Sequence, residues 1–180
     1  MADKFEALSD DLIRFIAAQK VFFVGTAAPD GRVNVSPKGQ DSLRVLDPRT
    51  LLWLNLTGSG NETAAHIAAA NRITLMWCAF EGPPMILRVY GTAHAVHPRD
   101  PEWGACTREI DAPLGARQYF RVGVDLVQTS CGYAVPLMDY REDRTALAKW
   151  SEKKGAEGIA EYWRDRNTQS LDGLETGIFG

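Results

Sequence analysis

Residues 51–77, LLWLNLTGSGNETAAHIAAANRITLMW, contain a strand, a glycine loop, a helix and a second strand in close succession. Leu51–Leu56 is an apolar run with the composition of a buried strand. The strand is interrupted at Thr57–Gly60, where two glycines accept backbone angles that other residues resist. Apolar side chains then recur at helical spacing, which predicts a short helix over about 61–70. The next strand is predicted at Ile73–Phe80.

The start of this helix has two interpretations. A strand, a glycine loop and a helix N-terminus form a ready anion site, because free N–H groups converge there and the helix dipole adds partial positive charge. Ser59 and Glu62 also have the spacing of a capping box, in which their side chains satisfy those N–H groups themselves. The local pattern leaves both interpretations open. At its other end, the helix is predicted to stop at Asn71 in a left-handed conformation.

Length, charge and cysteine content bound the class of protein. A chain of 180 residues suits one domain with a sizeable core. The net charge of −3 provides no global attraction to nucleic acid or to anionic membranes, and no apolar run is long enough to span a bilayer. The amino-terminal stretch has no apolar signal core. Three scattered cysteines argue against a disulfide framework, so we expect a cytoplasmic protein in a reducing compartment.

The remaining pattern predicts strands joined by short turns. A first helix is expected from its cap at Ser9 to Lys20, and Gly91 is expected to mark a bulge or bend. Loops this short cannot hold crossover helices, so the pattern favours an α+β fold that is mainly antiparallel β. The further strands are predicted at 21–26, 32–36, 43–46, 85–97 and 119–127, with a continuation to 133 left open.

The last third of the sequence is helical. One helix is predicted over 144–154, ending at Gly155, and a second reaches about Arg166. A short helix is also predicted from about Pro101. The tail, residues 167–180, is polar and rich in glycine, and we expect it to be loosely held.

A second informative stretch is VNVSPKG, residues 33–39. Its alternating pattern ends at a proline, which cannot donate to a sheet, followed by Lys38 and a flexible glycine. A lysine at the rim of a strand can act as a point charge for a phosphate or for a reduced, anionic ring. The alternative is a solvated lysine at the end of a hairpin.

The two stretches, together with RVYGTA at 88–93, resemble the pyridoxamine 5′-phosphate oxidase-like family of FMN-binding split β-barrels. The likeness covers about residues 10–130. It implies a six-stranded split barrel with peripheral helices, an obligate homodimer and two FMN molecules at the subunit interface. The expected organisation is one FMN-binding domain over 1–180, with about 140–180 as a helical extension packed on it.

The resemblance also implies which residues contact the cofactor. Those on the strand that ends in Ser-Pro-Lys-Gly would line the ring or its ribityl chain, the next pair would border the ring, and the last three would open the helix on the phosphate side. In that order, they are Val35, Ser36, Pro37 and Lys38, then Leu56 and Thr57, then Asn61, Glu62 and Thr63. A further cluster of Ser130, Cys131 and Tyr133 is hypothesised to approach the flavin of the partner subunit, with a β-bulge and a buried cysteine as the alternative. No side chain is assigned as a catalytic acid or base, and no metal site is expected.

Two departures from the family pattern shape the expected function. The oxidases carry basic side chains at the helix start, where this chain has Asn61-Glu62-Thr63, and their arginine-containing carboxyl-terminal substrate motif has no counterpart here. Vitamin B6 phosphate is therefore not the expected substrate. We expect an FMN-dependent oxidoreductase of unknown substrate, with NADH or NADPH as candidate donors. The alternatives are a deazaflavin- or haem-binding protein, and a non-catalytic flavin-binding or flavin-sensing protein.

Overall fold

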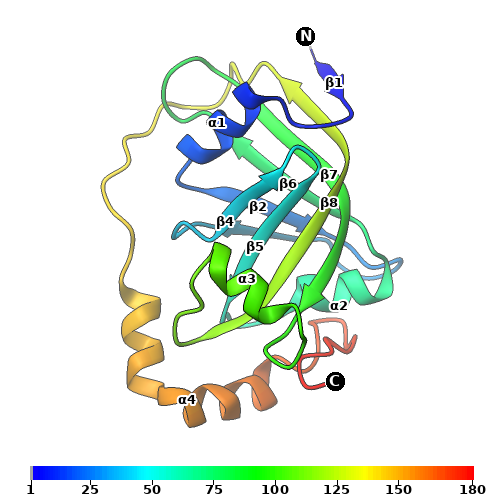
Figure 1. Cartoon of the computed structure of the whole chain (residues 1–180), viewed down its shortest axis with the longest axis vertical. Coiled ribbons are helices and arrows are strands. Elements are labelled where there is room, and N and C mark those ends of the chain that lie inside the picture. Colours follow the sequence, from blue (N-terminus) through cyan, green and yellow to red (C-terminus); the bar gives the residue numbers. More distant parts are fainter. Residues whose placement is uncertain (1) are drawn as a thin grey trace.

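The computed structural model describes residues 2–180, which form one sheet of eight strands and four helices (Figure 1). The strands are β1 (Asp3–Phe5), β2 (Phe22–Thr26), β3 (Asn34–Lys38), β4 (Leu43–Asp47), β5 (Thr50–Leu56), β6 (Ile73–Cys78), β7 (Ile86–Val96) and β8 (Ala116–Ser130). The helices are α1 (Asp10–Ala18), α2 (Glu62–Ala69), α3 (Trp103–Glu109) and α4 (Ala146–Arg166).

All the strand pairings are antiparallel, as the sequence predicts, and the strand order is β3-β2-β6-β7-β8-β5-β4 with β1 added beside β8. The sheet therefore ends at β3 on one side and at β4 on the other, and it is an open, split barrel. The resemblance implies six strands, and this count is too low. The short strand β1, which pairs with β8, was not predicted from the sequence pattern.

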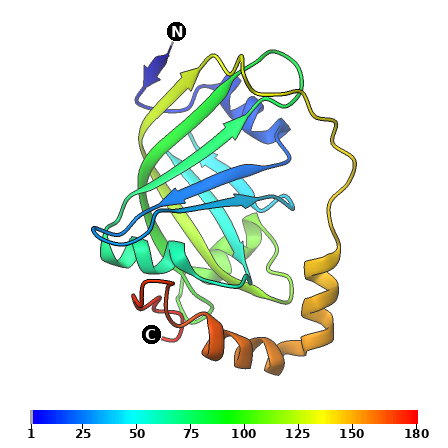
Figure 2. The same cartoon turned by 180° about the vertical axis from the view of Figure 1, so that it is seen from behind.

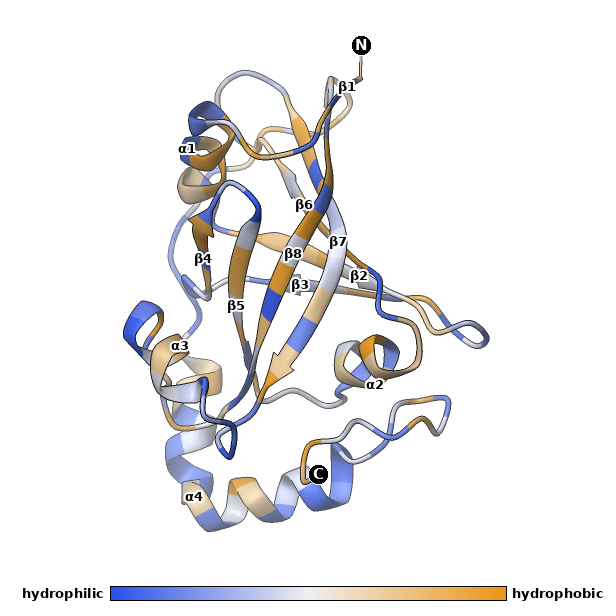
Figure 3. Ribbon diagram, turned by 45° about the vertical axis from the view of Figure 1, so that its right-hand side comes forward, coloured by the Kyte–Doolittle hydropathy of each residue, from blue (hydrophilic) through white to orange (hydrophobic). Residues whose placement is uncertain are grey.

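The core lies inside the curve of the sheet. Trp53 of β5 is fully buried and stacks on Phe120 of β8 with ring centroids 5.0 Å apart. Phe22 of β2 stacks on Trp77 of β6 at 5.9 Å, so the aromatic core joins four strands. Figure 3 shows the apolar residues concentrated on the strands, whereas α4 is largely hydrophilic. This division places α4 outside the core.

A close backbone approach at Gly91 bends the long strands. The register between β7 and β8 shifts between Tyr90 and Gly91, which confirms the predicted irregularity. A Cβ atom on Gly91 would lie 1.9 Å from the carbonyl oxygen of Gly123, so glycine is required there. Side chains on both sides of this irregularity belong to the core, from Leu87 to Val96 on β7 and from Ala116 to Val127 on β8.

The predicted helix boundaries at Ser9 and Gly155 are confirmed. The Ser9 hydroxyl accepts a hydrogen bond from the amide of Leu12 at 3.4 Å and caps α1. Gly155 adopts φ 67° and ψ 173°, which breaks α4 into two helical halves. Figure 2 shows the two halves of α4 (orange) running in different directions, below the long connection that leads from β8.

The helix predicted over about 61–70 is confirmed as α2, but two details considered for its ends are not found. Its N-cap is Asn61, which makes no side-chain cap hydrogen bond, so the alternative of a Ser59–Glu62 capping box does not form. Asn71 is not left-handed either, because Gln40 and Asp41 are the only non-glycine residues with positive φ in residues 2–180. Its side chain instead accepts a hydrogen bond from the amide of Ala93 at 2.7 Å. The Asn71 side chain therefore makes a tertiary contact rather than ending its own helix.

Candidate functional site

A cavity of about 590 Å³ opens beside edge strand β3. Its wall combines β3, the glycine loop before α2, the start of α2, the beginning of β8 and the end of α4 with the tail. The lining residues are Arg32, Val33, Asn34, Ser36, Lys38, Asn55, Gly58, Ser59, Gly60, Asn61, Glu62, Thr63, Arg117, Asp165, Arg166, Gln169, Ser170 and Leu171. The volume lies within the usual range for a small-molecule site, ~300–1,000 Å³.

Strand alternation sorts the predicted residues of β3 into two groups. Ser36 and Lys38 line the cavity, because residues two apart share one face of a strand. Val35 and Pro37 alternate with them and are exposed outside the cavity, and the Val35 side chain is 65% exposed. Pro37 is tolerated because β3 is an edge strand with a free side.

The start of α2 is tied into the cavity wall. Asn61 is only 1% exposed, and its Oδ1 accepts a hydrogen bond from Nε2 of Gln118 at 2.8 Å. The Glu62 carboxylate accepts the amide of Leu171 through both oxygens, at 3.0 and 3.1 Å. Thr63 is buried and also lines the cavity. Glu62 therefore faces the tail rather than capping its own helix.

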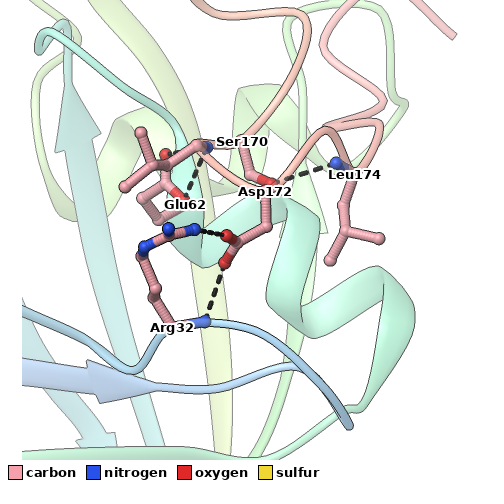
Figure 4. A network of polar contacts seen from close by, with 6 residues as sticks. Arg32, Glu62, Ser170, Asp172 and Leu174 are labelled. Carbon is pink, nitrogen blue, oxygen red and sulfur yellow. Dashed lines mark hydrogen bonds and ion pairs between the residues drawn. The ribbon is translucent and has the colours of Figure 1, made fainter.

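The tail, expected to be loosely held, is fastened to the sheet and forms a wall of the cavity. The Asp172 carboxylate accepts a hydrogen bond from the backbone amide of Arg32 at 2.7 Å and pairs with its guanidinium group (Figure 4). These hydrogen bonds lower the pKa of Asp172. Trp163 at the end of α4 donates from Nε1 to the hydroxyl of Thr57 at 2.8 Å. The tail thus joins the hairpin of β2 and β3 to the start of α2.

Arg117 is a site residue that the sequence interpretation missed. It lies on β8, is 2% exposed, and donates to the carbonyl of Gly60 at 2.8 Å and to Oδ1 of Asn167 at 2.7 Å. Burial lowers the pKa of its guanidinium group to about 9. The sequence signal was weak, because Arg117 lies two residues before the strand predicted at 119–127 and next to another polar residue, Gln118.

Lys38, beside Arg117 on the cavity wall, is the other unusual cation. Its Nζ lies 5.1 Å from the centre of the Trp53 ring, in a cation–π arrangement. Burial, and secondarily the charge of Arg117, lower the pKa of Lys38 to about 8. The alternative of a freely solvated hairpin lysine does not describe this side chain.

The other predicted residues lie outside the cavity. Leu56 is partly buried, and Thr57 is buried with its hydroxyl donating to the carbonyl of Gly115 at 2.8 Å. Ser130 accepts a hydrogen bond from Arg88 at the far end of β8, and Tyr133 is 82% exposed. Cys131 is exposed, so the alternative of a buried cysteine is wrong.

The cavity is equipped to bind an anionic small molecule. Amide, hydroxyl and cationic donors line it, and its four basic residues exceed its two acidic ones. Within residues 2–180, no group of three or more potential metal-ligating side chains occurs. Over the same range, no helix has both the length and the apolarity needed to cross a membrane.

An open antiparallel barrel with a cationic cavity at its edge strand defines the class of protein as a split β-barrel. The chain belongs to the pyridoxamine 5′-phosphate oxidase family, because the profile of that family matches residues 8–131. A pyridoxamine 5′-phosphate oxidase family protein of Aspergillus flavus, ustO, is 35% identical in an alignment 188 residues long, which covers 94% of this chain and 76% of that protein.

Two solved structures share the fold at low sequence identity. HupZ of Group A Streptococcus superposes with a TM-score of 0.54 at 19% identity, over 66% of this chain and 91% of that chain. A Lactobacillus delbrueckii protein, classed as a candidate pyridoxamine 5′-phosphate oxidase, gives a TM-score of 0.54 at 21% identity, over 68% of this chain and 94% of that one. These similarities establish the architecture of the barrel.

Proposed function

We propose that the protein binds FMN in the cavity beside β3 and acts as a flavin-dependent oxidoreductase. The observation that carries the proposal is the meeting of Ser36, Lys38, Asn61, Glu62 and Thr63 in one cavity, although they come from separate stretches of the sequence. Membership of the pyridoxamine 5′-phosphate oxidase family supports the same ligand class.

The cavity residues fit a phosphorylated, polar cofactor. In the part of the chain that the structure describes, the buried atoms Asn61 Nδ2 and Arg117 Nε have no hydrogen-bond partner. Both atoms are donors, and both residues line the cavity. Buried donors are nearly always paired, so a ligand oxygen is the natural partner here.

The roles of the residues follow from their chemistry. Asn61 and Thr63 would donate hydrogen bonds to a phosphorylated chain, and Ser36 on β3 would contact the cofactor along the strand. Lys38 would place positive charge near the ring edge, where it stabilises added negative charge. Bound FMN would supply hydride or electron transfer. No residue is assigned as a proton donor or acceptor.

We further propose that two copies of the chain form a homodimer that encloses the cofactor. Edge strand β3 exposes Val35 and Pro37 on its outer face. The segment after β8 exposes Tyr133, Leu137 and Met138. Exposed apolar side chains on an edge strand and on an irregular surface segment are typical of an interface. In this arrangement Ser130, Cys131 and Tyr133 would approach the cofactor bound mainly by the partner.

The organisation proposed for the chain is one split-barrel domain with residues 140–180 as a helical extension. The hydrogen bonds of Thr57 with Trp163 and of Arg117 with Asn167 support packing of this extension on the barrel. The free state of Cys78, Cys106 and Cys131 agrees with the proposed location in the reducing cytoplasm.

A direct titration tests the cofactor. FMN is added to the purified protein and its fluorescence is followed, with a reduced deazaflavin-type cofactor and haem titrated in parallel. We expect saturable FMN binding with one molecule per chain. Saturation by deazaflavin or haem alone would replace FMN with that ligand, and failure of all three would contradict a cofactor-binding role for the cavity.

The Lys38→Ala variant tests the residue placed at the ring edge. We expect weaker FMN retention or a lower flavin reduction potential, because the variant removes a positive charge that favours the reduced, anionic ring. Unchanged FMN content together with an unchanged potential would exclude Lys38 from the ring edge.

Anaerobic reduction separates an enzyme from a passive binder. Rapid bleaching of the bound flavin by NADH or NADPH, followed by reoxidation by an added acceptor, is the result expected of an oxidoreductase. Slow reduction by both donors would favour the non-catalytic flavin-binding or flavin-sensing alternative.

A further inference from the structure

Two cations on the cavity wall have no acidic partner. Arg117 is almost completely buried and donates to two neutral acceptors, the carbonyl of Gly60 and Oδ1 of Asn167. Among the ion pairs formed within residues 2–180, neither Arg117 nor Lys38 takes part. A buried cation is ordinarily paired, because burial without an opposite charge is costly. The folded chain alone does not supply that opposite charge.

The other charges around the cavity are already engaged. Arg32 pairs with Asp172, and Arg166 pairs with Asp165 at 2.7 Å. Glu62 directs its carboxylate to the amide of Leu171. The positive charge left for a ligand is therefore that of Lys38 and Arg117.

Unused hydrogen-bond donors lie on the same wall. Nε of Arg117 and Nδ2 of Asn61 are both buried and lack a partner in the described part of the chain. Oδ1 of Asn61 is fixed by Nε2 of Gln118, which holds the amide group so that Nδ2 is left over. A charged donor and a neutral donor are thus available together with the ammonium group of Lys38.

We propose that Arg117 and Lys38, assisted by Asn61, form an oxyanion subsite that takes a phosphate or carboxylate group of the bound small molecule. The assignment of that molecule rests on the function proposed above, whereas the subsite itself rests on the contacts of these three residues. Burial, and secondarily the charge of Arg117, lower the pKa of Lys38, and an anion between the two cations would relieve their mutual repulsion. The oxyanion belongs either to the 5′-phosphate of FMN, in which case Lys38 binds the phosphate instead of the ring edge proposed above, or to a substrate bound beside the ring.

Paired ligands and variants distinguish these two sources. Affinities for FMN and for riboflavin, which lacks the phosphate, are measured for the wild type, Arg117→Gln and Lys38→Met. Thermal protection by inorganic phosphate is measured for the same proteins. Arg121→Gln is the matched control, because Arg121 is an exposed arginine on the same strand outside the cavity.

Each source predicts a separate result. If the subsite holds the cofactor phosphate, both variants lose about tenfold or more in FMN affinity while riboflavin affinity changes little, since a charge-assisted hydrogen bond is lost only with FMN. If it holds a substrate oxyanion, both flavins bind as in the wild type, but inorganic phosphate raises the wild-type melting temperature and not that of the variants. The control behaves as the wild type in both cases.

Other results would contradict the subsite or the proposed cofactor. An FMN-to-riboflavin affinity ratio that is the same in all variants, together with no protection of the wild type by phosphate, overturns the subsite. If neither flavin binds the wild type, the proposed cofactor is wrong, and phosphate protection still decides the subsite. If Arg117→Gln fails to fold, Lys38→Met and the charge-conserving Arg117→Lys decide, the latter being expected to retain the wild-type preference.

Discussion

At the scale of single residues, Lys38 combines an aromatic contact with an unusual acidity. Its ammonium group lies over Trp53, which is fully buried, and it faces the charge of Arg117. Arg32, Glu62, Asp165 and Arg166 complete the charged lining. A lysine that titrates near neutrality can respond to a bound anion by taking up a proton.

This acidity predicts a pH-dependent affinity. Because the pKa of Lys38 in the folded protein is about 8, its charge is lost as the pH rises through 8, and oxyanion affinity is expected to fall there. Binding near pH 8 should take up protons, measurable by calorimetry in buffers of different ionisation enthalpy. Lys38→Met should bind without this uptake, and equal proton uptake in both proteins would exclude Lys38 as the source.

The same pKa has a consequence for stability with a definite sign. The pKa is lowered from 10.5 to about 8, so the folded chain holds fewer protons than the unfolded chain between these values. The penalty of burying the charged lysine is complete below pH 8 and is relieved as the pH rises through this window. The stability difference between wild type and Lys38→Met should therefore change in favour of the wild type from pH 8 to 10, as measured by urea unfolding.

Gly91 predicts a large effect from a single methyl group. Gly91→Ala would place Cβ 1.9 Å from the Gly123 carbonyl oxygen, and we expect a loss of about 1–3 kcal/mol or more in the free energy of unfolding. Gly104→Ala is the control, because Gly104 lies in α3 with open space around the added atom. Alanine favours a helix, so the control should keep or gain up to about 1 kcal/mol. Equal urea midpoints for the two variants would contradict the close approach.

At the scale of elements, the tail and α2 depend on each other. The contacts of Asp172 with Arg32 and of Glu62 with Leu171 hold the tail against two elements distant in sequence (Figure 4). Both contacts use carboxylates, and the hydrogen bonds from Arg32 lower the pKa of Asp172. The contribution of Asp172 is therefore present above the ordinary carboxyl pKa and is lost as the pH falls through the lowered value.

Asp172→Asn tests this attachment. We expect faster hydrogen exchange in the backbone of residues 167–180 with little change in global stability, because an ion pair at the surface contributes little to it. Asp30→Asn, an exposed neighbour in the hairpin turn, is the matched control and should leave tail exchange unchanged. Mass spectrometry of the carboxyl-terminal peptides measures both, and equal exchange in all three proteins would contradict the role of Asp172.

The elements were predictable where the signal is local. Alternation and glycine loops correctly place β5, α2 and β6, and Gly155 correctly ends the first half of α4. The capping box does not form because the Glu62 carboxylate instead accepts a hydrogen bond from the amide of Leu171, 109 residues away. The role of Arg117 and the attachment of the tail also depend on contacts between residues distant in sequence. Only the folded chain brings Asn167 to Arg117.

At the scale of the whole molecule, the proposed dimer makes a prediction of its own. Val35→Asp should convert a species of twice the 19.9 kDa chain mass into a monomer, because it places a charge on the exposed apolar face of β3. Leu114→Asp, at another exposed leucine, should leave the mass unchanged. Sedimentation analysis measures both, and a wild-type monomer would contradict the dimer outright.

The attachment of the tail also separates two properties of the molecule. The aromatic core of β2, β5, β6 and β8 does not include residues 167–180, yet Gln169, Ser170 and Leu171 form part of the ligand cavity. Exchanging these few side chains would change the ligand preference of the cavity without altering the aromatic core. Relatives with the same barrel could therefore diverge in chemical preference through this short carboxyl-terminal piece.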